Sequence, residues 1–196
     1  MLSLLPLLVA CAGPNDIAVG DDSSATGDTD TDTDTTSSSL TRPSVVINEF
    51  LAQNDTTNAD AADEYDDWIE LYNTGSAIVQ FDGLYLSDDE ANPLKWALPT
   101  GQGIDAGGHA LFWCDDDDGL GDSGTASQGD RHTSFNLSSS GETILLTYAV
   151  GGDSIMVDAI AFGAQQPDIS AARIPDGNED APMQYGTPTP NATNGS

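Results

Sequence analysis

Carboxylates supply most of the side chains in this chain that could carry chemistry. The stretch CDDDDGLGDSG (residues 114–124) holds five aspartates among three glycines, and hard cations such as Ca²⁺ bind six to eight oxygens from loops of this kind. Asp115, Asp117 and Asp122 are therefore calcium candidates, although the spacing is not that of an EF-hand. A second, weaker cluster is DAADEYDD (residues 60–67). The alternative for both segments is a loop of solvated acids.

One form of nucleophilic catalysis uses a cysteine with a histidine, and Cys114 with His109 or His132 would be such a pair. However, Cys114 ends the apolar alternation ALFWC, and a buried free cysteine commonly acts as a small hydrophobic side chain. Glu49 and Glu70 lie inside predicted strands, where we expect a structural, hydrogen-bonded role because an unpaired buried charge is costly. The chain has neither a Gly-x-Ser-x-Gly nor a His-Glu-x-x-His motif. We therefore expect no catalytic residues and no enzymatic activity.

These side chains are positioned by short strands. From residue 44 onward, apolar and β-branched runs alternate with turns rich in Gly, Asp, Ser and Pro, and no stretch has helical periodicity. This pattern predicts an all-β sandwich or barrel. In DWIELYN (67–73), alternation puts Ile69 and Leu71 toward a core. The same alternation predicts that Trp68, Glu70 and Tyr72 lie on the outer face or at an edge.

The first eleven residues, MLSLLPLLVAC, form an apolar run too short to span a bilayer but long enough for the core of a signal peptide. The end of this run, LVAC, resembles the lipobox of bacterial lipoproteins, in which the chain is cleaved before the cysteine and the cysteine receives lipid. No basic residue precedes the run, which departs from that pattern. The resemblance implies lipidation of Cys11 and a place in the cell envelope, at the outer membrane, with secretion as the alternative.

Residues 12–43 form a separate segment, rich in Asp, Thr and Ser, that includes the alternation TDTDTDT. It offers no apolar face to bury, and its like charges repel, so we expect a disordered, extended linker. The predicted organisation is a signal segment (1–11), this linker and a folded domain (44–194).

The charge of the chain limits its partners. Acidic residues number 33 and basic residues 4, for a formal net charge of −29. Phosphate backbones are bound by clusters of Lys and Arg, so nucleic acid is not an expected partner.

The folded part also resembles a known family. The ordered pieces are INEF, DWIELYN, GLYLSDD with NPLKWALP, IDAGGHALFWCD, HTSFNLSSSGETILL, DAIAFGAQQPDISAARIPDG and GTPTPNATN. Together, from Val45 to Asn194, they resemble the bacterial form of the lamin tail domain. The resemblance implies an immunoglobulin-like β-sandwich and a role as a non-catalytic accessory module of secreted and surface proteins.

Three functions remain open at this stage. The first is a surface-tethered lipoprotein that presents the sandwich as an interaction or structural module for an unknown envelope protein or glycan. Trp96 and Trp113 would favour a glycan if they shared one exposed flat face. The second is a calcium-dependent structural module of the cell surface, and the third is a hydrolase accessory subunit or an enzyme.

Overall fold

The computed structural model describes residues 40–116 and 131–195, which contain twelve β-strands and no helix. A helix that could cross a membrane is accordingly not found in these two ranges. The strands are, in chain order, β1 (Val45–Leu51), β2 (Asp67–Asn73), β3 (Val79–Gln80), β4 (Leu84–Ser87), β5 (Trp96–Ala97), β6 (Gly103–Ile104), β7 (His109–Cys114), β8 (His132–Thr133), β9 (Glu142–Val150), β10 (Asp153–Phe162), β11 (Ser170–Ala172) and β12 (Gln184–Gly186).

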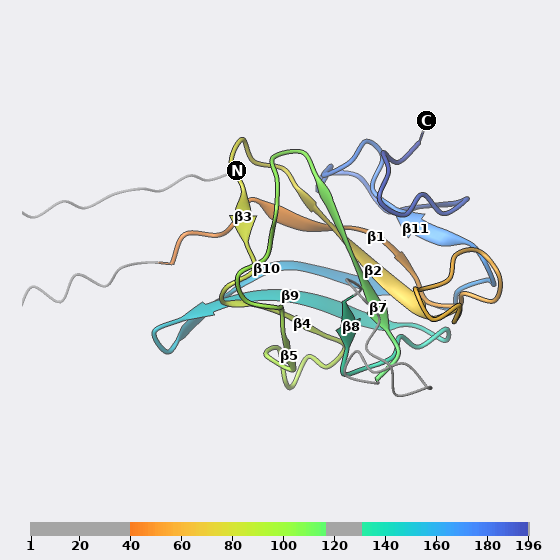
Figure 1. Cartoon of the computed structure of the whole chain (residues 1–196), viewed down its shortest axis with the longest axis horizontal. Helices are drawn as coiled ribbons and strands as arrows, with labels where there is room; N and C mark the ends of the chain where they lie inside the picture. Colours follow the sequence, from red (N-terminus) through yellow and green to blue (C-terminus); the bar gives the residue numbers. More distant parts are fainter. Residues whose placement is uncertain (1–39, 117–130, 196) are drawn as a thin grey trace, which may run out of the picture. The chain divides into compact units, whose positions relative to one another are not determined.

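The strands form two main layers (Figure 1). One sheet has six strands in the order β12-β11-β1-β2-β7-β8, and the other has four in the order β10-β9-β4-β5. A small two-stranded sheet pairs β3 with β6. All pairs are antiparallel except β7 with β8, which run parallel. This arrangement confirms the predicted all-β, immunoglobulin-like sandwich.

The core lies between the two sheets. Ile47 and Phe50 of β1 and Ile69 and Leu71 of β2 pack in one cluster with side chains of β4, β7 and β9. The predicted inward direction of Ile69 and Leu71 is therefore correct. Removing these side chains from water is the main favourable contribution to folding.

The hairpin between β9 and β10 shows how local sequence sets the chain path. Its turn residues Gly151 and Gly152 have φ values of 64° and 95°, a conformation that costs glycine little and other residues much. A two-residue turn of this kind brings two long strands into register, with Val150 opposite Asp153.

Trp68 and Glu70 lie on the face of β2 opposite Ile69 and Leu71, as predicted, but this outer face is not exposed. Trp68 and Glu70 are completely buried, because two other segments cover that face of the six-stranded sheet. Trp68 Nε1 donates to Asn58 Oδ1 in the loop before β2 (2.9 Å), and Glu70 accepts a hydrogen bond from the backbone of Asn191 near the C-terminus. Alternation separated the two faces correctly, but it does not show what packs on each.

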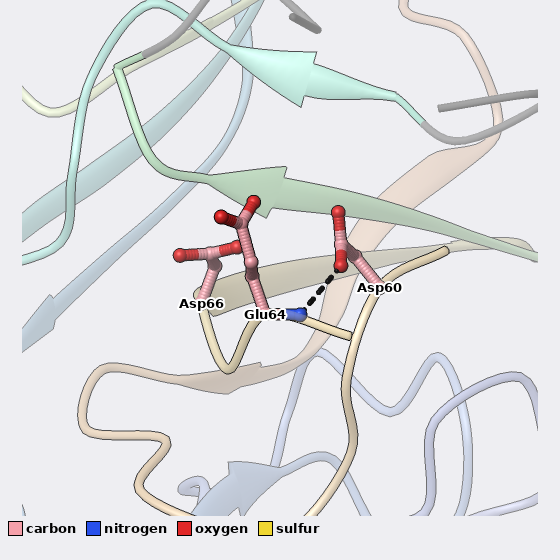
Figure 2. A group of neighbouring side chains, drawn as sticks. All are labelled: Asp60, Glu64 and Asp66. Carbon is pink, nitrogen blue, oxygen red and sulfur yellow. Dashed lines mark hydrogen bonds between the residues drawn. The ribbon is translucent and has the colours of Figure 1, made fainter. Parts of the chain in front are cut away.

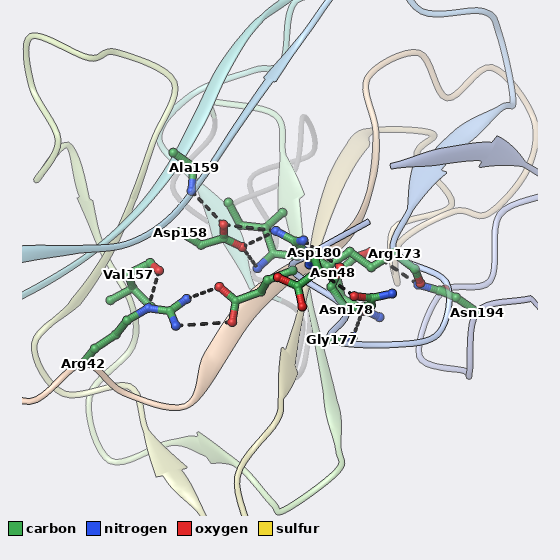
Figure 3. A network of polar contacts seen from close by, with 12 residues as sticks. Arg42, Asn48, Val157, Asp158, Ala159, Arg173, Gly177, Asn178, Asp180 and Asn194 are labelled. Atoms are coloured by element: carbon green, nitrogen blue, oxygen red, sulfur yellow. Dashed lines mark hydrogen bonds and ion pairs between the residues drawn. The ribbon is translucent and has the colours of Figure 1, made fainter. Parts of the chain in front are cut away.

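A buried ion pair joins the two sheets (Figure 3). Arg173, just after β11, lies 3.0 Å from Asp158 of β10, and both side chains are nearly inaccessible to solvent. Arg173 Nε also donates to the carbonyl of Ile47 on β1 (2.8 Å). Asp158 Oδ2 accepts from the backbone N–H of the same residue (2.8 Å). The backbone N–H and C=O of Ile47 on β1 are thus both bonded to the ion pair, and Asp158 of this pair belongs to the second sheet.

Replacing Arg173 with Met should lower the free energy of unfolding by about 3–5 kcal/mol, because it leaves the buried carboxylate of Asp158 without its cation. Urea denaturation of both proteins measures the difference. Lys95→Met is the matched control, since it removes a more exposed pair with Asp88 and should cost no more than about 1 kcal/mol. Equal losses in the two variants would contradict the role of the buried pair.

Candidate functional site

Three carboxylates converge in the loop between β1 and β2. Asp60, Glu64 and Asp66 each direct one oxygen to within 4.8 Å of the others, and Figure 2 shows the side chains of Glu64 and Asp66 side by side. The loop is folded by Asp60, whose Oδ1 accepts the backbone N–H groups of Ala62 (2.8 Å) and Glu64 (2.9 Å). These bonds turn the chain so that Glu64 returns toward Asp60, and Asp63 between them has a positive φ of 67°.

A histidine from a distant part of the sequence lies beside this loop. His132 pairs with Trp113 because β8 runs parallel to β7. Its Nδ1 lies 2.5 Å from Asp115 Oδ2, and its Nε2 lies 3.9 Å from Asp60 Oδ2. The side chains of His132 and Asp60 are fully buried.

Crowding of carboxylates changes the protonation of this cluster. Burial, together with the negative charges of Asp115, Asp60 and Glu64, raises the pKa of Asp66 to about 6. The electrostatic contribution of His132 lowers the pKa of Asp66. At neutral pH the cluster is therefore costly in its charged form, and a cation or protons would relieve it.

The structure describes only one of the three predicted calcium candidates. Asp115 forms an isolated β-bridge with Asn136, and its carboxylate is directed to His132. Asp117 and Asp122 lie outside the described residues. The segment 60–67, taken from sequence as the weaker cluster, is the one in which the described carboxylates converge.

Glu49 and Glu70 form a second concentration of acid. They are direct neighbours across β1 and β2, and both are completely buried. A register shift between Ile47 and Glu49 inserts Asn48 into β1, which keeps Ile47 in the core and turns Asn48 toward Glu70 (Nδ2 to Oε1, 3.2 Å).

The C-terminal segment supplies most of the donors for these glutamates. Thr189 donates its backbone N–H (3.0 Å) and its hydroxyl (2.9 Å) to Glu49, and Asn191 donates its N–H to Glu70 (2.5 Å). The predicted structural role of Glu49 and Glu70 agrees with these contacts. Burial nevertheless raises the pKa of Glu49, and it raises the pKa of Glu70 to about 8.

His109 lies at the margin of this region. Its Nε2 is 3.5 Å from Asp176 Oδ2 and 3.9 Å from Glu70 Oε1, and its ring packs on Tyr72 with centroids 4.9 Å apart. Asp176 is itself engaged, because its Oδ1 accepts from Asn48 (3.1 Å) and from the backbone of Asn194 (3.0 Å). The histidine therefore contacts acids whose other bonds hold the C-terminal segment.

Cys114 and the two histidines that were considered as its base are directed to different partners. Its Sγ lies 3.8 Å from the carbonyl of Phe112, whereas His132 Nδ1 is directed to Asp115 and His109 Nε2 to Asp176. Burial raises the pKa of the thiol well above its usual value. A thiol in such surroundings is a poor nucleophile, which agrees with a packing role.

The two tryptophans considered for glycan contact do not form an exposed flat face. Trp113 is only 4% exposed and packs with Leu51 and Trp68. Trp96 packs edge-on against Phe112, with ring centroids 5.9 Å apart. The condition under which they would favour a glycan partner is not met.

Comparison with protein families gives one result. A model of the family described as Lamin Tail Domain matches residues 38–164, which is well over half of the chain. The chain belongs to the lamin tail domain family. The matched range ends just after β10, whereas the sequence resemblance continues to Asn194. The structure joins the remaining part to the lamin tail sandwich through β11 and β12, which extend the six-stranded sheet. Comparisons with curated proteins and with solved structures each gave no match.

Sequence reasoning missed the residues that complete both acidic regions of the lamin tail domain. Nothing in the local sequence joins His132 to Asp60, because their proximity depends on the parallel pairing of β7 with β8. Thr189 and Asn191 likewise reach Glu49 and Glu70 across more than a hundred residues. The segment TPTPNATN is rich in polar residues, and this was the available signal that it covers the buried glutamates.

The buried acids predict that stability falls as pH rises. Glu70 has a folded-state pKa of about 8 against an ordinary value of 4.5, so between these values the folded protein binds more protons than the unfolded chain. For each such group, a rise of one pH unit between its unfolded-state and folded-state pKa values lowers the free energy of unfolding by up to about 1.4 kcal/mol. Asp66 and Asp67, whose pKa values burial raises to about 6, act in the same direction up to that pH.

Urea denaturation between pH 5 and 8.5 should therefore show a steady loss of stability, and Glu70→Gln should make the pH dependence shallower above pH 6 because it removes the titrating group. Asp153→Asn, at an exposed position of β10, is the control and should keep the wild-type slope. A Glu70→Gln protein with the full wild-type slope would contradict the assignment.

Proposed function

We propose that this protein is a non-catalytic, membrane-tethered module of the cell envelope that presents a lamin tail sandwich as an interaction or structural unit. The observation that carries the proposal is the use of the buried acids. Glu49, Glu70 and Asp158 each receive hydrogen bonds that hold one part of the sandwich to another. Polar residues committed in this way support a structural module rather than a reaction centre.

The tether is argued from sequence. LVAC at residues 8–11 resembles a lipobox, and the acidic linker that follows would hold the sandwich away from the membrane through repulsion of its like charges. The expected place is the outer membrane, with secretion as the alternative. The expected partner is an envelope protein or a glycan that binds the sandwich away from its buried acids.

A calcium-dependent structural module is the second candidate. It is favoured by one observation, the convergence of Asp60, Glu64 and Asp66 in the loop before β2. In that case calcium would order the loop rather than take part in a reaction. No residue arrangement in the described ranges argues for a hydrolase or a hydrolase accessory subunit in the same way.

Cys11→Ser should release the protein from membranes and abolish labelling by a fatty-acid analogue, because the serine hydroxyl does not replace the thiol that accepts the lipid. Membrane fractionation and metabolic labelling in a bacterial host measure both effects. Cys114→Ala is the matched control, since it removes the other cysteine, which is buried in the sandwich, and it should remain labelled and membrane-bound. A Cys11→Ser protein that still sediments with membranes would overturn the tether.

The interaction role has its own test. Cross-linking and affinity purification of the full chain from intact envelopes should recover a defined envelope protein or glycan at constant stoichiometry, and Cys11→Ser should lose that partner only if membrane attachment is needed to reach it. Recovery of no component above an unrelated lipoprotein carrying the same tether would overturn the interaction role.

A further inference from the structure

The carboxylates of Asp60, Glu64 and Asp66 are close enough to share one ion. Calcium binds oxygen at about 2.3–2.6 Å, so two oxygens on the same ion are at most about 5 Å apart. Each of the three residues offers an oxygen within 4.8 Å of the other two. Three negative ligands therefore lie within the span of one coordination sphere.

A second observation points to a ligand at this place. The side chain of Asp60 is fully buried, and its Oδ2 has no hydrogen-bond partner, since His132 Nε2 lies 3.9 Å away, beyond hydrogen-bond distance. Its Oδ1 alone makes the bonds that fold the loop. In Figure 2 the unbonded oxygen of Asp60 points to the same side of the loop as the carboxylate of Glu64. Asp66 also has a buried oxygen, Oδ2, without a partner.

Such oxygens are expensive in a folded protein. A buried polar atom normally has a hydrogen-bond donor, and a buried carboxylate without one costs several kcal/mol. Asp60 and Asp66 both show this deficit within one loop, and the neighbouring acids make it worse by repulsion. A divalent cation would satisfy the unbonded oxygens and cancel the repulsion in one step.

We infer that Asp60, Glu64 and Asp66 form a binding site for one calcium ion in the loop between β1 and β2. All three ligands are oxygens, which favours a hard cation over zinc. Calcium suits an irregular loop better than magnesium, which requires near-ideal octahedral geometry and keeps most of its water. Glu64 and Asp66 are partly exposed, so the ion has a path from solvent, and solvent water completes its coordination.

The bound ion would also stabilise the cover of the outer face. The same loop contains Asn58, which accepts the Trp68 indole N–H (2.9 Å), and Trp68 packs with Leu51 and Trp113 beneath it. An ion that draws together the two arms of the loop therefore keeps this cluster closed. The inference does not depend on the tether, since calcium binding and membrane attachment are measured separately.

The test is calcium titration of the full chain after treatment with a chelator and its removal, in about 0.15 M NaCl so that non-specific charge effects are screened. Calorimetry should show one ion per chain, with a dissociation constant of about 10⁻⁴–10⁻³ M, the range of extracellular calcium modules. The melting temperature should rise with the logarithm of free calcium above that constant. Magnesium at the same concentrations should give a clearly smaller rise.

Two isosteric variants remove ligands at partly exposed positions, Glu64→Gln and Asp66→Asn. Each should weaken calcium binding by about tenfold or more, as expected from loss of a charged ligand. Asp63→Asn is the matched control, because it makes the same charge change in the same loop at a residue outside the cluster. Asparagine also tolerates the positive φ of that position. Circular dichroism without calcium confirms that every variant keeps its strand content.

Several results would overturn the inference. Absence of saturable calcium binding would do so, as would an equal loss in Asp63→Asn, which would indicate a diffuse charge effect. Tighter binding of zinc or equal binding of magnesium would contradict the choice of calcium. Loss of binding on replacing Asp115, Asp117 and Asp122 with Asn, with no loss in Glu64→Gln or Asp66→Asn, would place the site in the segment after β7.

Discussion

The fold depends on the burial of two acidic side chains side by side. Glu49 and Glu70 are direct neighbours on β1 and β2 and are both removed from solvent, an arrangement that repulsion and desolvation oppose. It is tolerated because Asn48, Thr189 and Asn191 supply donors to the carboxylates. The segment after β12 is therefore part of the sandwich, since without it the centre of the six-stranded sheet would hold unbonded carboxylates. Protonation of Glu70, whose pKa is about 8, removes part of the remaining repulsion.

The sequence revealed the inner half of this structure far better than the outer half. Alternation in DWIELYN identified Ile69 and Leu71 as core residues, because one side of every strand in a sandwich must face the other sheet. It placed Trp68 and Glu70 on the outer face but did not show that this face is buried, because alternation carries no information on a cover supplied by the 52–66 loop and by residues near 190. The cluster Asp60, Glu64 and Asp66 was visible in sequence, since its members lie within seven residues. The approach of His132 was not, because it follows from the pairing of β7 with β8.

The few cations of the chain are used as structural contacts rather than to neutralise the surface. Arg173 is buried against Asp158, Lys95 pairs with Asp88 and lies 5.4 Å from the Phe135 ring centroid, and Arg131 lies 5.4 Å from the Phe81 ring centroid. The domain from residue 43 has 26 acids and three cations, a net charge of −23. Most of this charge is left to solvent ions, so the stability of the sandwich depends on its core and on a few buried polar contacts. Local groups of acids, such as the loop before β2, are the places where a specific ion has the most to offset.

The sheet margins indicate how such a module would meet a partner. An exposed strand edge is a template for pairing with another chain, and proteins limit this with short or interrupted edges. The two main sheets have four marginal strands, and three of these, β5, β8 and β12, have only two or three residues. The fourth, β10, is long, but its register shifts between Met156 and Asp158. Arg42 Nε donates a hydrogen bond to the carbonyl of Val157 (2.6 Å), and Asp158 forms an ion pair with Arg173. Strand addition is therefore disfavoured at each margin of the two main sheets, as far as the structure describes them. For the proposed interaction role, the loops are therefore the surfaces that remain for contact, and they carry most of the acidic residues of this lamin tail domain.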